Sequence, residues 1–246
     1  MMRRRFPMKL LIRIVGALLI LVEPILAFVY RLSPARCPSI ITYALGIATV
    51  EHRKGFYTLD RIVRSTGRFD GAIIECGTYS GQTLLGMAHL LSLRSINVHL
   101  YGLDSFEGFP KPTEQDALPD GSFHPAVQKG HFKDVSYERL IKKIARLGFA
   151  DRITLVRGFF QDTLPSLKDE NFSLVHLDCD LYQSYKTCLK FLYQQVLRGG
   201  FIVFDEYDEP AYPGGKKAID EFFLSKPEEI QRYAECVQPR YFIQKQ

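Results

Sequence analysis

The stretch "LVHLDCDLYQSY" at residues 174–185, together with "FIVFDEYDEP" at residues 201–210, decides the fold of this chain. Each stretch begins as an apolar run, which is typical of a strand buried on both faces of a parallel sheet. The first run ends in Asp178 and Asp180, and the second ends in Asp205 and Glu206. Because neighbouring parallel strands end at the same edge of a sheet, these four acids are expected to converge there.

Converging carboxylates repel one another and raise one another's pKa. A hard divalent cation removes that conflict, and oxygen-only ligands select magnesium or calcium over zinc. The sequence therefore predicts a divalent-cation site at this edge, with solvated loop acids as the alternative.

The rest of the chain alternates predicted strands with predicted helices. Strands are predicted at residues 71–77, 97–104, 151–158, 172–178 and 201–207, helices at 57–66, 81–93, 136–148, 183–196 and 215–225, and a closing strand pair at 229–235 and 240–246. This order predicts an α/β fold with a doubly wound, mostly parallel sheet. The long segment 105–133, rich in Pro, Gly and acids, is a candidate lid.

The turn "ECGTYSG" at residues 75–81 follows the first predicted strand. It is neither a P-loop nor a GxGxxG motif, so a pyrophosphate is disfavoured. A Gly-rich turn after Glu75 suits a cofactor that approaches the backbone closely and carries positive charge, although an ordinary strand-to-helix turn is the alternative. Asp104, at the end of the second strand, is placed to bind a ribose diol, with a helix cap or a loop salt bridge as the alternative.

The positive charge of the chain gathers at its N-terminus. Residues 1–50 hold seven Lys and Arg against one Glu, whereas the remainder holds 25 basic and 26 acidic residues. This distribution argues against a nucleic-acid partner and favours a membrane surface. The apolar segment within residues 1–31 is interrupted by Arg13, Glu23 and Pro24, so we expect a kinked helix in the interface or a shallow re-entrant hairpin on the cytoplasmic face. A helical arm packed on the protein or on a second subunit, as in a homodimer, is the alternative.

We divide the chain into this N-terminal segment, residues 1–50, and a domain at residues 51–246. The five cysteines show neither a CxxC pair nor zinc-ligand spacing, which points to a reducing compartment.

Five blocks in this order, "ECGTYSGQT", "LDSFEGFP", "GFFQDTLP", "LDCDLYQSYKTCLKFLYQQVLRGGFIVFDEY" and "KKAIDEF", resemble the macrocin O-methyltransferase family over about residues 55–235. The resemblance implies a class I methyltransferase sheet of seven strands with the last one antiparallel. It also implies S-adenosylmethionine and Mg²⁺ as cofactors, and a hydroxyl of a sugar or polyol as the methyl acceptor.

The family pattern implies a role for individual residues. The metal ligands would be Asp178, Asp205 and Glu206, and the general base would be Asp180. The family usually has Asp at the position of Glu206, which is one methylene longer. The cofactor would be bound by Glu75, Gly77, Tyr79, Ser80, Gly81, Thr83, Asp104, Ser105, Gly158 and Phe159.

Two alternatives to this enzyme stay open at the level of sequence. One is a non-catalytic, membrane-associated module that binds the cofactor, and the other is a nicotinamide-dependent oxidoreductase. His124 and His131 lie within the candidate lid, where each is either a second base or substrate contact, or an ordinary surface histidine.

Overall fold

The computed structural model describes residues 59, 62–63, 66, 69–128, 131–232 and 240–246. The predicted N-terminal segment at residues 1–50 lies outside this range, as does most of the predicted helix at residues 57–66. Among the helices that are described, none combines the length and the apolar character needed to cross a bilayer.

Seven strands in the described part of the chain form one sheet in the order β3-β2-β1-β4-β5-β7-β6. Their bounds are β1 (Ala72–Cys76), β2 (Leu100–Asp104), β3 (Ile153–Arg157), β4 (Phe172–Leu177), β5 (Val196–Phe204), β6 (Gln231–Arg232) and β7 (Tyr241–Gln244). Strands β1 to β5 are mutually parallel, and β7 is antiparallel to both of its neighbours. The predicted doubly wound sheet is confirmed, including its antiparallel last strand.

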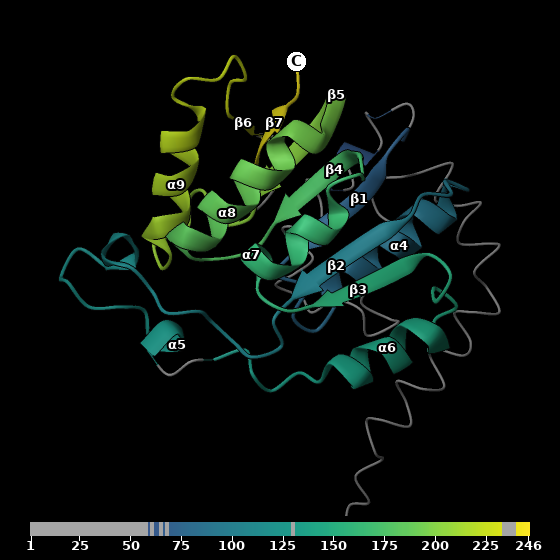
Figure 1. Cartoon of the computed structure of the whole chain (residues 1–246), viewed down its shortest axis with the longest axis horizontal. Coiled ribbons are helices and arrows are strands. Elements are labelled where there is room, and N and C mark those ends of the chain that lie inside the picture. The colour runs from purple at the N-terminus through teal and green to yellow at the C-terminus, as the bar shows by residue number, and fades with distance from the viewer. Residues whose placement is uncertain (1–58, 60–61, 64–65, 67–68, 129–130, 233–239) are drawn as a thin grey trace, which may run out of the picture.

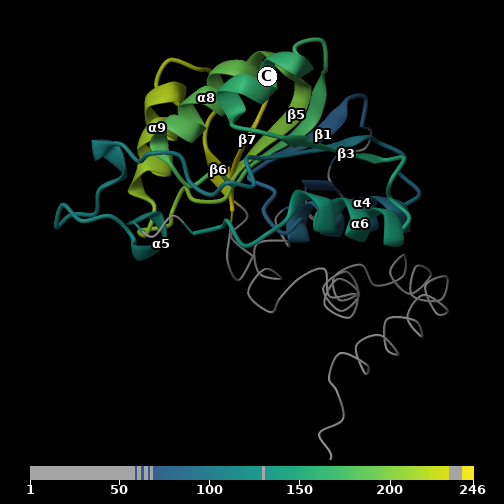
Figure 2. The ribbon, with the colours of Figure 1, turned by 60° about the horizontal axis from the view of Figure 1, so that its bottom comes forward.

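Helices cover both faces of the sheet. One face carries α4 (Gln82–Leu93) and α6 (Tyr137–Arg146), and the other carries α8 (Tyr182–Leu192) and α9 (Pro213–Phe223) (Figures 1 and 2). The short elements are η1 (Glu114–Asp116), α5 (Pro125–Gln128), α7 (Phe160–Thr163), η2 (Leu164–Leu167) and η3 (Tyr193–Gln195). The sheet is therefore the middle layer of three.

The strand sequences explain this layering. Successive side chains of a strand point to opposite faces, and in β1 Ile73 packs among the residues of α4 whereas Ile74 packs among those of α8 and α9. All residues of β1 and β4 are buried. Apolar residues predominate in both strands, as a strand covered on both faces requires, and their polar residues are Glu75, Ser173 and His176.

Strand β5 begins at Val196, five residues before the predicted start at Phe201. Val196 pairs with Phe172 and Phe201 pairs with Leu174, so the segment between them bulges out of the ladder. Gly199 has a φ of +80°, a conformation that glycine adopts without strain. The sequence "RGG" at residues 198–200 is also typical of the end of a helix, here the one predicted at residues 183–196, but it forms this bulge.

The carboxyl ends of β1 to β5 share one edge of the sheet. The loop at residues 105–133, which carries α5, extends past this edge (Figure 1).

Candidate active site

A cavity of about 710 Å³ lies at the carboxyl edge of the sheet. The residues that line it come from the turn after β1, the ends of β2 and β4, the turn after β3, the start of α8 and the first part of the loop at residues 105–133. Open α/β sheets bind ligands at this edge, and the volume suits a small molecule of cofactor size.

The turn after β1 approaches the end of β4 so closely that only glycine fits at residue 77. Gly77 has a φ of +96°, and a Cβ atom there would lie 1.6 Å from the carbonyl oxygen of Asp178. The N–H of Asp178 donates to the carbonyl of Cys76 at 2.9 Å. The predicted cofactor turn and the first predicted metal ligand are therefore in backbone contact.

The carboxylate of Asp104 ties the end of β2 to the same turn. One of its oxygens accepts the N–H of Tyr79 and the other accepts the N–H of Phe106, each at 2.7 Å. Burial raises the pKa of Asp104, although both hydrogen bonds act to lower it. A carboxylate has about four acceptor sites, so Asp104 retains capacity to bind a diol while it orients the turn.

Most residues predicted to bind the cofactor lie on the cavity wall. The residues that line it are Gly77, Tyr79, Thr83, Asp104, Ser105, Gly158 and Phe159, and those outside its lining are Glu75, Ser80 and Gly81. Gly81 packs against α6, since a Cβ atom there would lie 2.5 Å from a methyl carbon of Leu140. Whether each of these residues contacts a cofactor stays a prediction.

The acids of the two quoted stretches converge as the sequence predicted. Asp178, Asp180 and Asp205 reach the cavity wall, and oxygen atoms of Asp178, Asp205 and Glu206 lie within 4.8 Å of one another. Burial raises the pKa of Asp178 well above its ordinary value, and the charges of Asp205 and Glu206 raise it further. Burial likewise raises the pKa of Asp180, with added repulsion from Asp178 and Asp205.

This group of acids fits a hard divalent cation. Mg²⁺ prefers carboxylate and water oxygens, and it commonly takes one or two carboxylates and leaves room for oxygens of a substrate. A cation bound among Asp178, Asp205 and Glu206 would offset both the burial and the mutual repulsion that raise the pKa of Asp178 and Glu206.

Glu206 is fixed by two hydrogen bonds to one of its carboxylate oxygens. One of its carboxylate oxygens accepts the N–H of Asp180 at 3.2 Å and is also hydrogen-bonded by the hydroxyl of Tyr185. Glu206 is buried and lies outside the cavity lining. Asp180 has a φ of +59°, so its bond to Glu206 stabilises an uncommon backbone conformation in the turn that carries the predicted general base.

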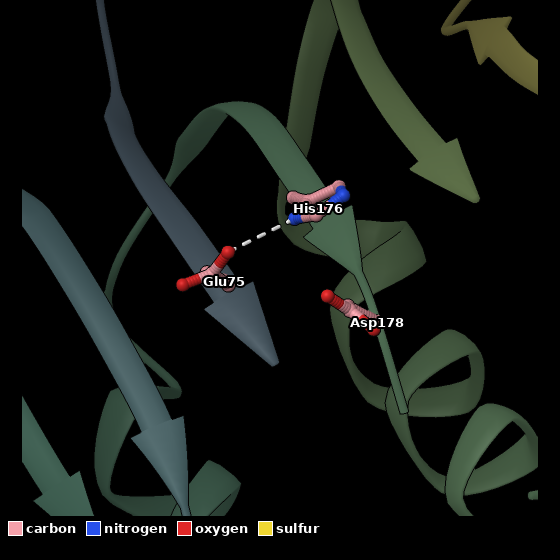
Figure 3. Close-up of side chains that lie close together, drawn as sticks. All are labelled: Glu75, His176 and Asp178. Atoms are coloured by element: carbon pink, nitrogen blue, oxygen red, sulfur yellow. Dashed lines mark hydrogen bonds and ion pairs between the residues drawn. The ribbon is translucent and has the colours of Figure 1, made fainter. Parts of the chain in front are cut away.

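Two basic residues at the site were not among the predicted site residues. His176 lies in β4, and one of its ring nitrogens is 3.1 Å from the carboxylate of Glu75 (Figure 3). Its other ring nitrogen is 3.6 Å from the carboxylate of Asp205. Arg240 lies just before β7, with its Nε atom 2.7 Å from the same oxygen of Asp205. Burial alone would lower the pKa of His176, but the neighbouring carboxylates of Asp205 and Glu75 raise it to about 10.

The available sequence signal for His176 was a polar residue inside a fully buried strand, because a buried polar group needs a partner. Arg240 carried no such signal, because its contact with Asp205 depends on how β7 pairs with β5.

The loop at residues 105–133 is anchored to the helices above the cavity. The buried carboxylate of Asp116 accepts the N–H of Tyr182, the first residue of α8, at 2.7 Å with one oxygen. Its other oxygen accepts the N–H and the hydroxyl of Thr113 at 2.7 Å and 2.8 Å. A Cβ atom at Gly214, in the first turn of α9, would lie 2.0 Å from the oxygen that binds Tyr182. Asp116 therefore places the loop at the N-termini of two helices, where negative charge is favourable.

Aromatic rings join this loop to the cofactor turn. Phe132 contacts Tyr79 on one side and Phe109 on the other, with ring centroids 5.0 Å and 5.1 Å apart. The ring of His124 lies 5.2 Å from that of Tyr212, at the start of α9. Tyr79, Phe109 and Phe132 line the cavity, whereas both predicted histidine candidates, His124 and His131, lie outside its lining.

This sheet order, with a Gly-rich turn after the first strand and a cavity at the carboxyl edge, is the class I methyltransferase fold. Solved structures with the same fold include CalS11, a calicheamicin methyltransferase, with a TM-score of 0.69 and 19% identity over 98% of this chain and 94% of that one. The O-methyltransferase NovP has a TM-score of 0.64 and 21% identity over 84% of this chain and 81% of that one.

The family model for macrocin O-methyltransferase (TylF) matches residues 54–231, so the chain belongs to this family of S-adenosylmethionine-dependent O-methyltransferases. A relative from Streptomyces olivaceus, 8-demethyl-8-(2,3-dimethoxy-alpha-L-rhamnosyl)-tetracenomycin-C 4'-O-methyltransferase, is 25% identical over 75% of this chain and 72% of its own length. Mycinamicin III 3''-O-methyltransferase from Micromonospora griseorubida is 26% identical over 62% of this chain and 60% of its own length.

Proposed function

We propose that this enzyme transfers the methyl group of S-adenosylmethionine to a hydroxyl of a sugar, a glycoside or a related polyol, with Mg²⁺ held by Asp178, Asp205 and Glu206. The observation that carries the proposal is the convergence of these acids on a cavity that the Gly-rich turn also lines. The name of the Streptomyces olivaceus relative supports the acceptor class, because it describes O-methylation of a compound that carries a rhamnosyl group.

The chemistry divides between the cofactors and the protein. S-adenosylmethionine supplies an electrophilic methyl group, and Mg²⁺ supplies a Lewis acid that lowers the pKa of an alcohol. Asp180 lies on the cavity wall next to the three proposed metal ligands, and it accepts the proton of the acceptor hydroxyl as general base. The bond from its backbone N–H to Glu206 holds the turn that carries it.

The loop at residues 105–133 supplies the acceptor side of the cavity. Phe109 and Phe132 present apolar rings at the wall, against which the C–H face of a sugar ring can pack. The Asp116 anchor keeps this part of the loop over the carboxyl edge, where it excludes water from the reacting groups.

Methyl transfer from labelled S-adenosylmethionine to a set of sugars, glycosides and phenols tests the proposal. We expect labelling of a sugar or glycoside hydroxyl that stops on adding EDTA and returns with Mg²⁺. Asp178→Asn should abolish transfer, whereas Asp162→Asn, at an exposed position on α7, should not. Activity that survives both the chelator and Asp178→Asn would remove the metal from the proposal, and transfer to phenols alone would overturn the acceptor class.

We further propose that residues 1–31 hold the enzyme on the cytoplasmic face of a membrane. The support is the excess of Lys and Arg in an apolar segment. The full-length protein should co-sediment with vesicles that contain anionic lipid and should be released by roughly 1 M salt, because screening lengths shrink to about 3 Å. Equal binding to neutral vesicles would remove the electrostatic part of the proposal. No binding to either kind of vesicle would favour the alternative, a helical arm packed on the protein or on a second subunit. Light scattering of the same preparation tests the alternative of a homodimer.

A further inference from the structure

Glu75 and His176 form a buried pair in the middle of the sheet, on the adjacent strands β1 and β4. The side chain of each is only 1% exposed, and the Nδ1 atom of His176 lies 3.1 Å from a carboxylate oxygen of Glu75 (Figure 3). A carboxylate buried to this degree is costly unless it is paired. Glu75 does not line the cavity, so its partner within the described structure is the imidazole ring.

The other ring nitrogen of His176 faces Asp205. Its distance to the Oδ1 atom of Asp205 is 3.6 Å, and the Nε atom of Arg240 lies 2.7 Å from that same oxygen. Two basic groups thus converge on one carboxylate oxygen of a predicted metal ligand. The ion pair with Arg240 and the neighbouring imidazole ring restrict the rotation of the Asp205 side chain. Glu75 in turn restricts the rotation of the His176 ring.

We propose that Glu75 and His176 are positioning residues for the cation site, with Glu75 orienting the imidazole and His176 orienting the carboxylate of Asp205. The inference rests on the proposed function, because it takes Asp205 as a magnesium ligand. Groups that orient metal ligands from behind contribute to affinity, and their removal typically weakens metal binding about 10-fold to 100-fold. This role for Glu75 differs from the cofactor contact that the sequence predicts.

A second arrangement of the same residues has to be separated from this one. Glu75, His176 and Asp178 also bring ligand atoms within 4.8 Å of one another, so they could hold an ion of their own. We favour the positioning pair because the 3.1 Å contact between Glu75 and His176 occupies one potential ligand atom of each. A second ion would have to displace this contact.

Binding of Mn²⁺ to the full-length protein, followed by electron paramagnetic resonance without substrate, tests the inference. The main variant is Glu75→Gln, which keeps the size of the side chain, and the second is His176→Gln. We expect one ion per wild-type chain and a dissociation constant raised about 10-fold to 100-fold in both variants. Calorimetry with S-adenosylmethionine should give an affinity for Glu75→Gln within about twofold of wild type, because Glu75 lies outside the cavity lining.

The matched control is Glu228→Gln. Glu228 is also a buried carboxylate paired with a basic group, Lys245 at 3.0 Å. It lies toward the opposite edge of the sheet, because Lys245 follows the end of the antiparallel strand β7. This variant should be destabilised and yet bind Mn²⁺ as wild type does, which separates loss of stability from loss of positioning.

The other outcomes overturn the inference in distinguishable ways. Unchanged Mn²⁺ affinity in Glu75→Gln and His176→Gln would refute the positioning role alone, and weaker S-adenosylmethionine binding with intact Mn²⁺ binding would return Glu75 to the cofactor. Two ions per wild-type chain, falling to one in the variants, would make the pair part of a second metal site. Wild-type protein that binds no Mn²⁺ would overturn the proposed metal site as well.

Discussion

Replacement of Asp116 by alanine should loosen the loop at residues 105–133 from the rest of the enzyme. The carboxylate is 4% exposed and accepts three hydrogen bonds, one from the N–H of Tyr182 and two from Thr113. Asp116→Ala would leave the first N–H of α8 without this partner and would remove negative charge from a helix N-terminus. A structural effect and a functional effect should therefore appear together.

The magnitude follows from these contacts. A hydrogen bond to a charged group contributes about 1.5–3 kcal/mol, and a buried donor left unsatisfied costs about 1–3 kcal/mol. Both values describe the loss of the same bond to Tyr182, so they are not added in full, and we expect a loss of about 3 kcal/mol in the free energy of unfolding. For a domain of this size that corresponds to a fall in Tm of roughly 6–12 °C. Asp116→Asn keeps an acceptor for Tyr182 and should lose about half as much.

Thermal unfolding and steady-state kinetics measure the two effects. The KM for the acceptor should rise in Asp116→Ala, because Phe109 belongs to the anchored loop, whereas the affinity for S-adenosylmethionine should change little. Asp120→Ala is the control, since Asp120 is exposed in the same loop and, among the residues that the structure describes, its carboxylate is hydrogen-bonded by Ser122 alone. Gly214→Ala would place a Cβ atom 2.0 Å from the Asp116 carboxylate and should act in the same direction. A Tm for Asp116→Ala within about 2 °C of that for Asp120→Ala would refute the anchor.

Three further results are expected. Gly77→Ala should weaken the binding of both S-adenosylmethionine and Mn²⁺ in calorimetry. The added Cβ atom would lie 1.6 Å from the carbonyl oxygen of Asp178, so the cofactor turn would have to move away from Asp178 and the neighbouring acids. Unchanged binding of both ligands would contradict this contact. Hydrogen bonds from Tyr193 and Lys245 lower the pKa of Glu228 despite its burial. The wild-type protein should therefore lose more stability than Glu228→Gln as the pH falls from about 5 to 3. A difference in Tm between the two proteins that stays constant over this range would exclude the effect. Burial raises the pKa of Cys179 to about 12, so a thiol reagent at pH 8 should label Cys179 only after unfolding, and rapid labelling of the native protein would show that this thiol is accessible.

Much of the fold was predictable because its determinants are local. Apolar runs bounded by turn residues located β1 to β5. The helix predicted from Ser136 is α6, and Ser136 is its N-cap, with its side chain accepting the N–H of Arg139 at 3.4 Å. The start of β5 was wrong by five residues, because "RGG" suits both a helix stop and a bulge. The pairing of β5 with β4 favours the bulge, and the local sequence does not determine which strands pair.

The sequence by itself determined which chemical groups stand at the carboxyl edge, since apolar strands that end in Asp178 and Asp205 must place them there once the sheet is parallel. The tertiary structure alone decided which groups face one another. Glu75 meets His176 from 101 residues away and Asp116 meets Tyr182 from 66 residues away. Arg240 reaches Asp205 only because β7 returns antiparallel beside β5. The physical reason is that the period of a strand sets the face of each side chain, whereas the order and register of strands depend on packing of the whole sheet.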